Sequence, residues 1–189
     1  MNNRFVVTGG PGGGKTTILT ALAERGYDFA PESARRIIQQ RLAAGISPRP
    51  EPVLFAREIL SADMEKYRKA DPIGRPMFFD RGVLDALYML DAENALSRDQ
   101  IEQYIKEFPY NKIVFLLPPW DEIYVTDSER DQTLEQAVEV YAGMKNWYQQ
   151  WGYEIMEVPR THVDKRVAFI LKAVGTTLIS SGKGESATL

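Results

Sequence analysis

The stretch RFVVTGGPGGGKTT, residues 4–17, decides the fold: an apolar run is followed by five glycines, one proline and then Lys-Thr-Thr. The run over 4–8 is rich in β-branched and aromatic side chains and predicts a buried strand, and the residues from 14 onward predict a helix. The spacing Gly9-x-x-x-x-Gly14-Lys15-Thr16 between a strand and a helix is the pattern of a phosphate-binding loop. A flexible glycine turn is the alternative, but the flanking strand and helix favour the loop.

In such a loop the glycines let the backbone curl, so that successive N–H groups point at phosphate oxygens at a helix N-terminus. Lys15 is predicted to reach the β- and γ-phosphates of a nucleotide, and the Thr16 hydroxyl is predicted to bind Mg²⁺. The residues predicted to bind the nucleotide are Gly9, Gly10, Pro11, Gly12, Gly13, Gly14, Lys15, Thr16 and Thr17.

Short apolar runs alternate with longer helical patterns along the rest of the chain, which predicts a doubly wound α/β fold. Most runs lack a polar/apolar alternation, which suits strands buried on both faces of a parallel sheet. We expect residues 1–180 to form one domain and 181–189 to form a frayed tail. Strands are predicted over 4–8, 27–30, 76–80, 112–117 and 153–158, and helices over 14–25, 32–44, 51–70, 82–92, 97–107, 131–150 and 163–180.

The composition excludes several classes of function. The 189 residues carry a net charge of −3 with acids and bases intermixed, no cysteine and a single histidine, His162. Disulfides, thiolate catalysis and a zinc site with several histidines are therefore excluded. The charge gives no reason to expect nucleic acid as a partner, and the apolar stretches are too short to span a membrane. With no signal-peptide pattern before the first strand, we expect a cytoplasmic protein, either a monomer or a homodimer.

The run PMFFD ends in Asp80, which is followed by Arg81 and Gly82. An acid at the end of a second core strand is predicted to hold Mg²⁺ through water. The alternative is that Asp80 caps the next helix, and both roles can coexist. A glutamate in the next position would activate water in a motor-type ATPase, but Arg81 stands there instead. An arginine beside the magnesium acid suits binding of an anionic substrate or stabilisation of transferred charge.

The segment APESARRIIQQ, residues 30–40, is the best candidate for the site of a phosphoryl acceptor, because it follows the second strand. Glu32 is predicted to accept the proton of an acceptor hydroxyl, while Arg35 or Arg36 orients the acceptor. The alternative is a helix-start acid that pairs with one of these arginines. Asp85, three residues beyond Gly82, is a weaker candidate for the acceptor site.

A charged stretch, WDEIYVTDSERDQTLEQA over 120–137, lies between a strand and a long helix and predicts a lid at about 120–132. Arg130 is predicted to fold over the phosphates and neutralise charge as the γ-phosphoryl group leaves. The alternative is a solvated loop in which Asp127 and Glu129 balance Arg130. His162 is interpreted as an ordinary loop histidine that follows the last strand, although it could lie near an adenine ring.

Taken together, TGGPGGGKTT, PESARR, FFDRG, FLLPPWDEIY, DSERDQTLEQA and GYEIMEVP resemble the single-domain, AAA-labelled family of predicted P-loop ATPases. This family is close to the nucleoside- and nucleotide-kinase-like P-loop proteins, including ribosylnicotinamide kinase domains. The resemblance implies a three-layer P-loop NTPase fold with a five-stranded parallel sheet in the order 2-3-1-4-5. It also implies that ATP and Mg²⁺ bind at the carboxyl edge of the sheet, that Gly12, Gly14, Lys15, Thr16 and Thr17 contact the nucleotide, and that Arg130 lies in a lid.

The predicted function is transfer of the ATP γ-phosphate to a small metabolite, nucleoside- or nucleotide-like. Catalysis is assigned to Lys15, Glu32, Asp80 and Arg130, acceptor binding to Glu32, Arg35, Arg36, Arg81 and Asp85, and the metal to Thr16 and Asp80. A slow ATPase that acts as a nucleotide-dependent switch for a protein partner is the main alternative, and a nucleotide-binding module without turnover is a third.

Overall fold

The computed structural model describes residues 2–70, 74–123 and 133–182, with side chains up to residue 176. Every predicted strand and helix is present within these residues, with ends that differ by at most three positions. The strands are β1 (Arg4–Thr8), β2 (Asp28–Ala30), β3 (Met77–Asp80), β4 (Ile113–Leu116) and β5 (Glu154–Glu157). The helices are α1 (Lys15–Ala23), α2 (Ser33–Ala43), α3 (Pro52–Lys69), α4 (Val83–Ala92), α5 (Arg98–Glu107), α6 (Leu134–Gln150) and α7 (Val163–Gly182), with a short 3₁₀ helix η1 (Asp121–Ile123).

The strands form one sheet in the order β2-β3-β1-β4-β5, and every neighbouring pair is parallel. The predicted sheet and strand order are confirmed, and the fold is that of an α/β P-loop NTPase. Because β1 lies in the middle, the loop after β1 is flanked by the chain segments that leave β2 and β3 on one side and β4 and β5 on the other. Ligands bind at this carboxyl edge in folds of this kind.

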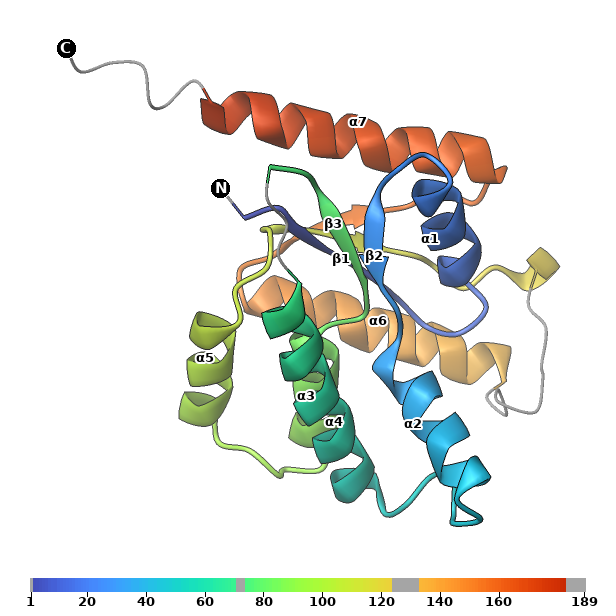
Figure 1. Cartoon of the computed structure of the whole chain (residues 1–189), viewed down its shortest axis with the longest axis vertical. Helices are drawn as coiled ribbons and strands as arrows, with labels where there is room; N and C mark the ends of the chain where they lie inside the picture. The colour runs from blue at the N-terminus through green and yellow to red at the C-terminus, as the bar shows by residue number, and fades with distance from the viewer. Residues whose placement is uncertain (1, 71–73, 124–132, 183–189) are drawn as a thin grey trace.

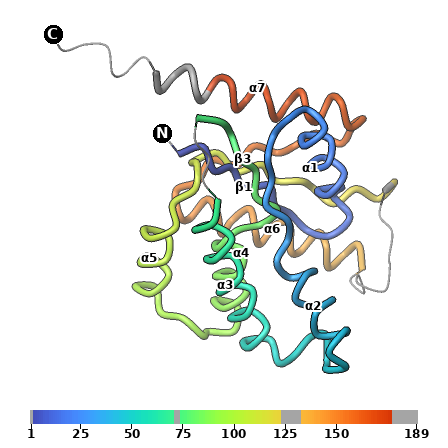
Figure 2. The backbone as a smooth tube through the Cα atoms, viewed as in Figure 1, coloured from blue at the N-terminus to red at the C-terminus, as the bar shows by residue number. Residues whose placement is uncertain are grey.

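Helices cover both faces of the sheet, which makes three layers (Figure 1). Phe5 and Val7 of β1 pack in a core with residues of α1 and α7, whereas Val6, between them, packs in the core of α2–α6. This alternation explains why β1 is apolar at successive positions: both of its faces are buried. The backbone trace in Figure 2 shows the α1–α7 layer and the α2–α6 layer on opposite sides of the sheet.

Local signals set several helix boundaries. Ser97 accepts a hydrogen bond from the Gln100 backbone, and the Gln100 side chain accepts one from the Ser97 N–H, which is the reciprocal cap that begins α5. Pro52 occupies the first turn of α3, where its missing N–H costs nothing, and the Glu51 carboxylate caps that turn.

Two predicted segments lie partly or wholly outside the described residues. Of the lid over 120–132, the structure describes only Trp120 and η1, so Arg130 lies outside the described residues. The predicted tail over 181–189 lies outside them from residue 183 onward, and α7 extends to Gly182. Among the helices that are described, none is both long enough and apolar enough to cross a membrane.

Gly9 packs directly against the backbone that follows β4, and we expect Gly9→Ala to destabilise the protein by about 3 kcal/mol. Gly9 has φ +132°, and a Cβ atom there would lie 2.3 Å from the backbone oxygen of Leu117. Gly26→Ala is a matched control: Gly26 also has a positive φ, +83°, but no described atom lies within 4 Å of an added Cβ. Its expected cost is about 1 kcal/mol. Urea unfolding of both variants separates the effect of backbone strain from the effect of the clash. An equal loss in the free energy of unfolding in the two variants would contradict the prediction.

Candidate active site

The loop between β1 and α1 has the geometry of an anion cradle. Gly14, with φ 77°, begins α1 and has no side chain to cap the first helical N–H groups, and the first turn contains no acidic residue. These N–H groups and the helix dipole are therefore available to an anion. The loop packs closely against β4 and α6, because a Cβ atom on Gly10 would lie 2.7 Å from the Ala137 backbone oxygen. Side chains at Gly9 or Gly10 would force the loop away from its supports.

Lys15 is buried at the start of α1, with 9% of its surface exposed. Its ammonium group donates to the backbone oxygens of Gly9 and Gly10, at 3.1 and 2.9 Å. Burial, followed by repulsion from Arg81, lowers the pKa of Lys15 to about 8, although Asp80 and Glu32 oppose the shift. The ammonium is thus held over the loop, where it would meet bound phosphates.

Asp80 ends β3 directly beside β1, in register with Val7. Its carboxylate is buried, and its Oδ1 atom has no hydrogen-bond partner among the described atoms. Burial raises the pKa of Asp80, with Lys15 opposing the shift and Glu32 adding to it. Gly82, not Asp80, caps α4, so the predicted capping role is wrong. A buried carboxylate oxygen without a described partner at a strand end fits a metal-bound water. Thr16, which is exposed, lines the cavity at the phosphate loop, whereas Asp80 is not among the residues that line it.

Glu32 and Arg81 form an ion pair across the ends of β2 and β3. The Arg81 Nε donates to Glu32 Oε1 at 3.0 Å, and each side chain is 23% exposed. Arg81 has φ 59°, a left-handed conformation that is uncommon for a residue with a side chain and is concentrated at functional sites. Burial acts to raise the pKa of Glu32, but the charges of Arg81, Lys15 and Arg35 outweigh it and lower the pKa. Glu32 is therefore ionised at neutral pH.

Asp85 holds Arg81 in place from the first turn of α4. Its Oδ1 accepts from the Thr8 hydroxyl and from Arg81 Nη1 (3.4 Å), and its Oδ2 accepts from the Gly82 N–H (2.9 Å) and the Tyr148 hydroxyl (2.7 Å). These donors come from β1, the β3–α4 connection and α6. Since both oxygens are already occupied by protein donors, Asp85 is suited to orienting Arg81 rather than binding an acceptor directly.

A cavity of about 910 Å³ joins these groups. The phosphate loop forms its middle, as the position of β1 requires. Glu32, Arg35 and Arg81, which follow β2 and β3, line one side together with apolar side chains of α3, α4 and α6. The apolar wall consists of Phe55, Ile59, Met89, Val140 and Met144.

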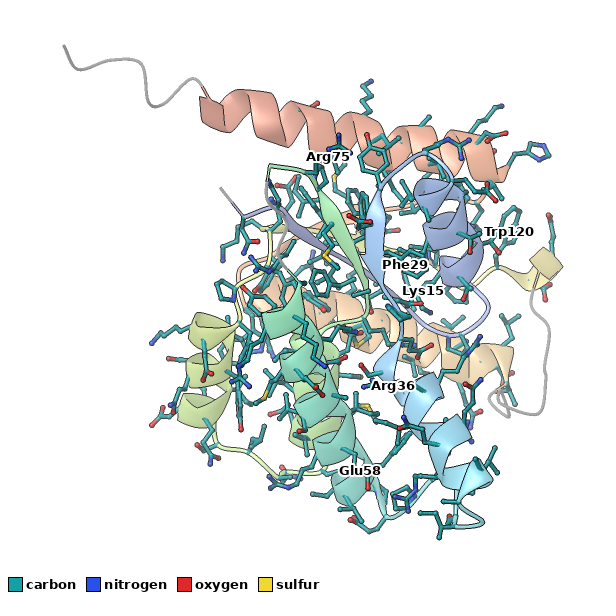
Figure 3. The ribbon with its side chains drawn as sticks, in the orientation of Figure 1. Lys15, Phe29, Arg36, Glu58, Arg75 and Trp120 are labelled. Atoms are coloured by element: carbon teal, nitrogen blue, oxygen red, sulfur yellow. The ribbon has the colours of Figure 1, made fainter. Side chains whose placement is uncertain are left out.

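The other side of this cavity is lined by residues that follow β4 and β5, including Trp120, His162 and Arg166. Figure 3 labels Lys15 at the start of α1 and Trp120 on the segment after β4, and both residues line the cavity. The structure thus brings Lys15, Thr16, Glu32, Arg35, Arg81 and Asp85 to one cavity. His162, interpreted from sequence as a loop histidine that could lie near an adenine ring, lines the same cavity. Arg36 is not among them: it lines a separate hollow of about 470 Å³ over α2 and α3.

Arg166, on this side, carries no motif that would have identified it from the sequence, and its contact with Trp120 of the predicted lid was not predicted. Arg166, in the first turns of α7, is 2% exposed and donates to the Gly13 backbone oxygen at 2.7 Å. Its guanidinium lies over the Trp120 ring, 5.7 Å from the ring centroid, and burial lowers its pKa. Arg166 and Trp120 meet only because β4 and β5 are neighbours, and no local pattern encodes that contact.

Asp80→Asn is expected to weaken Mg²⁺ binding and to stabilise the protein without ligand. The pKa of Asp80 is raised in the folded state. At a pH between the usual pKa and the raised pKa, Asp80 is therefore protonated more often in the folded protein than in the unfolded chain. Stability therefore falls as the pH rises through that window, and at neutral pH the ionised carboxylate costs stability. Removing the charge should add about 1 kcal/mol. Loss of a group that orients metal-bound water should weaken Mg²⁺ binding by about 10- to 100-fold.

Two measurements check this prediction: thermal unfolding without nucleotide, and the Mg²⁺ dependence of ATP binding. The exposed Asp91→Asn, at the end of α4, is the matched control and should change neither. Unaltered Mg²⁺ dependence in Asp80→Asn would contradict the metal role, and a lower melting temperature would contradict the electrostatic argument.

Comparisons with known proteins agree with this geometry. Residues 4–166 match the model of a family described as an AAA domain. No curated protein matches the chain significantly. Among solved structures, deoxyadenosine kinase from M. mycoides, with products dCMP and dCDP, has 14% identity and a TM-score of 0.57 over 92% of this chain and 99% of that one.

A second solved structure, the NadR protein in complex with NR, has 14% identity and a TM-score of 0.66. That match covers 91% of this chain and 49% of the NadR chain, so this chain spans about half of NadR. At these identities the likeness is one of fold, and both structures share the α/β P-loop architecture with this protein. Because the family model covers most of the sequence, from the first strand to the first turns of α7, the chain belongs to this AAA domain family.

Proposed function

We propose that the protein is an ATP- and Mg²⁺-dependent phosphotransferase that acts on a small, nucleoside- or nucleotide-like acceptor. The observation that carries this proposal is the shared cavity: a phosphate loop lies in its middle, with the Glu32–Arg81 pair on one side and Trp120, His162 and Arg166 on the other. A cavity with a base, a cation and an anion cradle has the parts that phosphoryl transfer between two small molecules needs.

The side lined by Trp120, His162 and Arg166 suits the nucleobase of ATP. Trp120 presents an aromatic ring under a guanidinium, and the two together offer a flat, partly apolar platform. Arg166 is tied to Gly13 of the phosphate loop, so the platform and the cradle are held at a defined spacing. ATP would then extend from this platform across the loop, with its γ-phosphate toward Glu32 and Arg81.

The opposite side suits the acceptor. Glu32 takes the proton from the acceptor hydroxyl as that oxygen bonds to the γ-phosphorus, and the bond between the γ-phosphorus and the β–γ bridging oxygen breaks to leave ADP. Arg81 and Lys15 stabilise the charge that spreads over the transferred group. The apolar wall of Phe55, Ile59, Met89, Val140 and Met144 suits a ring system such as a nucleobase and helps to exclude water.

Mg²⁺ would be held by the Thr16 hydroxyl, by phosphate oxygens and, through water, by Asp80. When bound, it neutralises phosphate charge and helps to hold the phosphates in line for transfer. The fold neighbours also support the proposal, since one of them is named as a deoxyadenosine kinase and its structure contains bound dATP.

The test is ADP release from ATP·Mg²⁺ in the presence of nucleosides, deoxynucleosides, nucleotides, small sugars and small acids, with products followed by mass spectrometry. One acceptor should raise ADP release well above the background and gain a phosphate, and Lys15→Met should strongly lower the rates of both. Slow ADP release that no acceptor changes would favour an ATPase switch, and tight ATP binding without any product would favour a binding module.

A further inference from the structure

Lys66 of α3 lies where the ends of β2 and β3 meet, and no motif singles it out. Its ammonium group lies 2.8 Å from Asp63 Oδ1 and donates to the backbone oxygens of Pro31, Asp80 and Arg81 at 3.3, 3.2 and 3.3 Å. Its side chain is 10% exposed. An ammonium has three donors, so four close oxygens leave none of its N–H groups for solvent.

The three carbonyls belong to the two segments that carry the Glu32–Arg81 pair. Pro31 precedes Glu32 at the end of β2, and Asp80 and Arg81 close β3. The carboxyl ends of neighbouring parallel strands lie at the same edge of the sheet, and one cation that contacts carbonyls of both segments holds them at a fixed spacing. The left-handed φ of Arg81, 59°, needs such support because it is unfavourable for a residue with a side chain.

Asp63 completes the arrangement from the same helix. It is 1% exposed and accepts from the Ser33 hydroxyl at 2.5 Å as well as from Lys66. Ser33 directly follows Glu32, so Glu32 is flanked by Pro31, which is bonded to Lys66, and by Ser33, which is bonded to Asp63. This network fixes the backbone on both sides of the proposed base, although neither Lys66 nor Asp63 contacts Glu32 itself.

We propose that Lys66 is a positioning residue for phosphoryl transfer: it holds the ends of β2 and β3 so that Glu32 and Arg81 meet beside the phosphate loop. This inference rests on the proposed function for its catalytic consequence, but its structural content can be tested without any turnover. A purely structural role would lower stability and leave the Glu32–Arg81 hydrogen bond as it is.

The experiment compares Lys66→Met with Lys69→Met in the full chain. Lys69 lies on the same helix, pairs with Glu65 at the surface and is 74% exposed, so its loss removes a lysine without touching the strand ends. The probe is the Arg81 Nε–H proton in ¹⁵N–¹H spectra, assigned by its loss in Arg81→Lys. In Lys66→Met its exchange with water should be at least about tenfold faster than in the natural protein, because the bond to Glu32 is no longer held. Lys69→Met should leave it unchanged.

Unchanged exchange in folded Lys66→Met would overturn the inference. Should that variant not fold, because Asp63 is left buried without its cation, Lys66→Met/Asp63→Asn removes both charges and is subject to the same criterion.

If an acceptor is found, kcat in the variant should fall by about 10²-fold with the KM for ATP unchanged. A matched rise in KM with normal kcat would also overturn the inference. Failure to find any acceptor bears on the proposed function alone, since the exchange measurement needs none.

Discussion

Lys15→Met is expected to lower the rate of phosphoryl transfer by about 10²- to 10³-fold, because it removes a charge aimed at the transferred group. Methionine keeps the length and the apolar contacts of the lysine stem while it removes the ammonium. In the protein without nucleotide that ammonium contacts only nearby loop carbonyls among the described atoms, Gly9 and Gly10. Since burial depresses the pKa of Lys15, the substitution should not destabilise the fold at neutral pH.

The rate is measured as acceptor-dependent ADP release, and ATP affinity is measured by calorimetry on the same protein. Lys172→Met, an exposed lysine on α7, is the matched control and should behave as the natural protein. Full turnover in Lys15→Met would contradict a catalytic role for Lys15 of the phosphate loop, whichever ligand the loop binds.

The titration of Lys15 gives an independent check. Its pKa of about 8 means that the free protein loses this proton at a pH where an ordinary lysine keeps it. Bound phosphates favour the charged form, so ATP binding near pH 8 should be accompanied by proton uptake, and ATP affinity should fall as the pH rises through that value. Calorimetry in buffers of different ionisation enthalpy measures the uptake. Lys15→Met should show none, and uptake of equal size in both proteins would assign the proton to another group.

The parts of this structure that were predictable from the sequence are those with a local cause. The apolar run over 4–8 has to be a strand buried on both faces, and glycines next to Lys15 have to form a tight turn before a helix. Each helix boundary likewise depends on neighbours in sequence, as Ser97 and Gln100 show. Helices on both faces of one parallel sheet then leave few arrangements, and family resemblance supplied the strand order.

The parts that were not predictable depend on contacts between distant segments. Glu32 and Arg81 are 49 positions apart and meet because β2 and β3 are neighbours. The sequence did not show which of Arg35 and Arg36 faces the cavity, because either could have lain at the strand end. A helix turns by about 100° per residue, so Arg35 lines the cavity while Arg36 lines the separate hollow over α2 and α3. Lys66 had no signal at all, since its acceptors are backbone carbonyls.

Glu32→Gln carries the second large prediction: kcat should fall by about 10²- to 10⁴-fold, the range for loss of a general base. The amide has nearly the shape of the carboxylate and can still accept a hydrogen bond from Arg81 Nε, which the pair makes at 3.0 Å. It cannot accept the proton of an acceptor hydroxyl. ATP affinity should remain close to that of the natural protein, because Glu32 lies on the acceptor side of the phosphate loop.

The pH dependence separates this role from a structural one. The charges of Arg81, Lys15 and Arg35 lower the pKa of Glu32 below its usual value of 4.5 against the opposing effect of burial, so the base is ionised throughout the neutral range. Glu32 therefore contributes stability that is present above its usual pKa and is lost as the pH falls through its lowered one. In Glu32→Gln the loss of stability at acid pH should be smaller. At neutral pH the melting temperature should drop modestly, because the uncharged amide does not form an ion pair with Arg81.

The measurement is kcat and the KM for ATP with a working acceptor, beside Glu65→Gln, a surface glutamate of α3 that pairs with Lys69. A large loss in kcat with little change in the KM for ATP assigns proton transfer to Glu32. Normal kcat with a lower melting temperature would leave Glu32 as the partner that holds Arg81, and the base would have to be sought elsewhere on the acceptor side. Those two outcomes cannot both hold, because only the first requires a carboxylate that exchanges a proton during turnover.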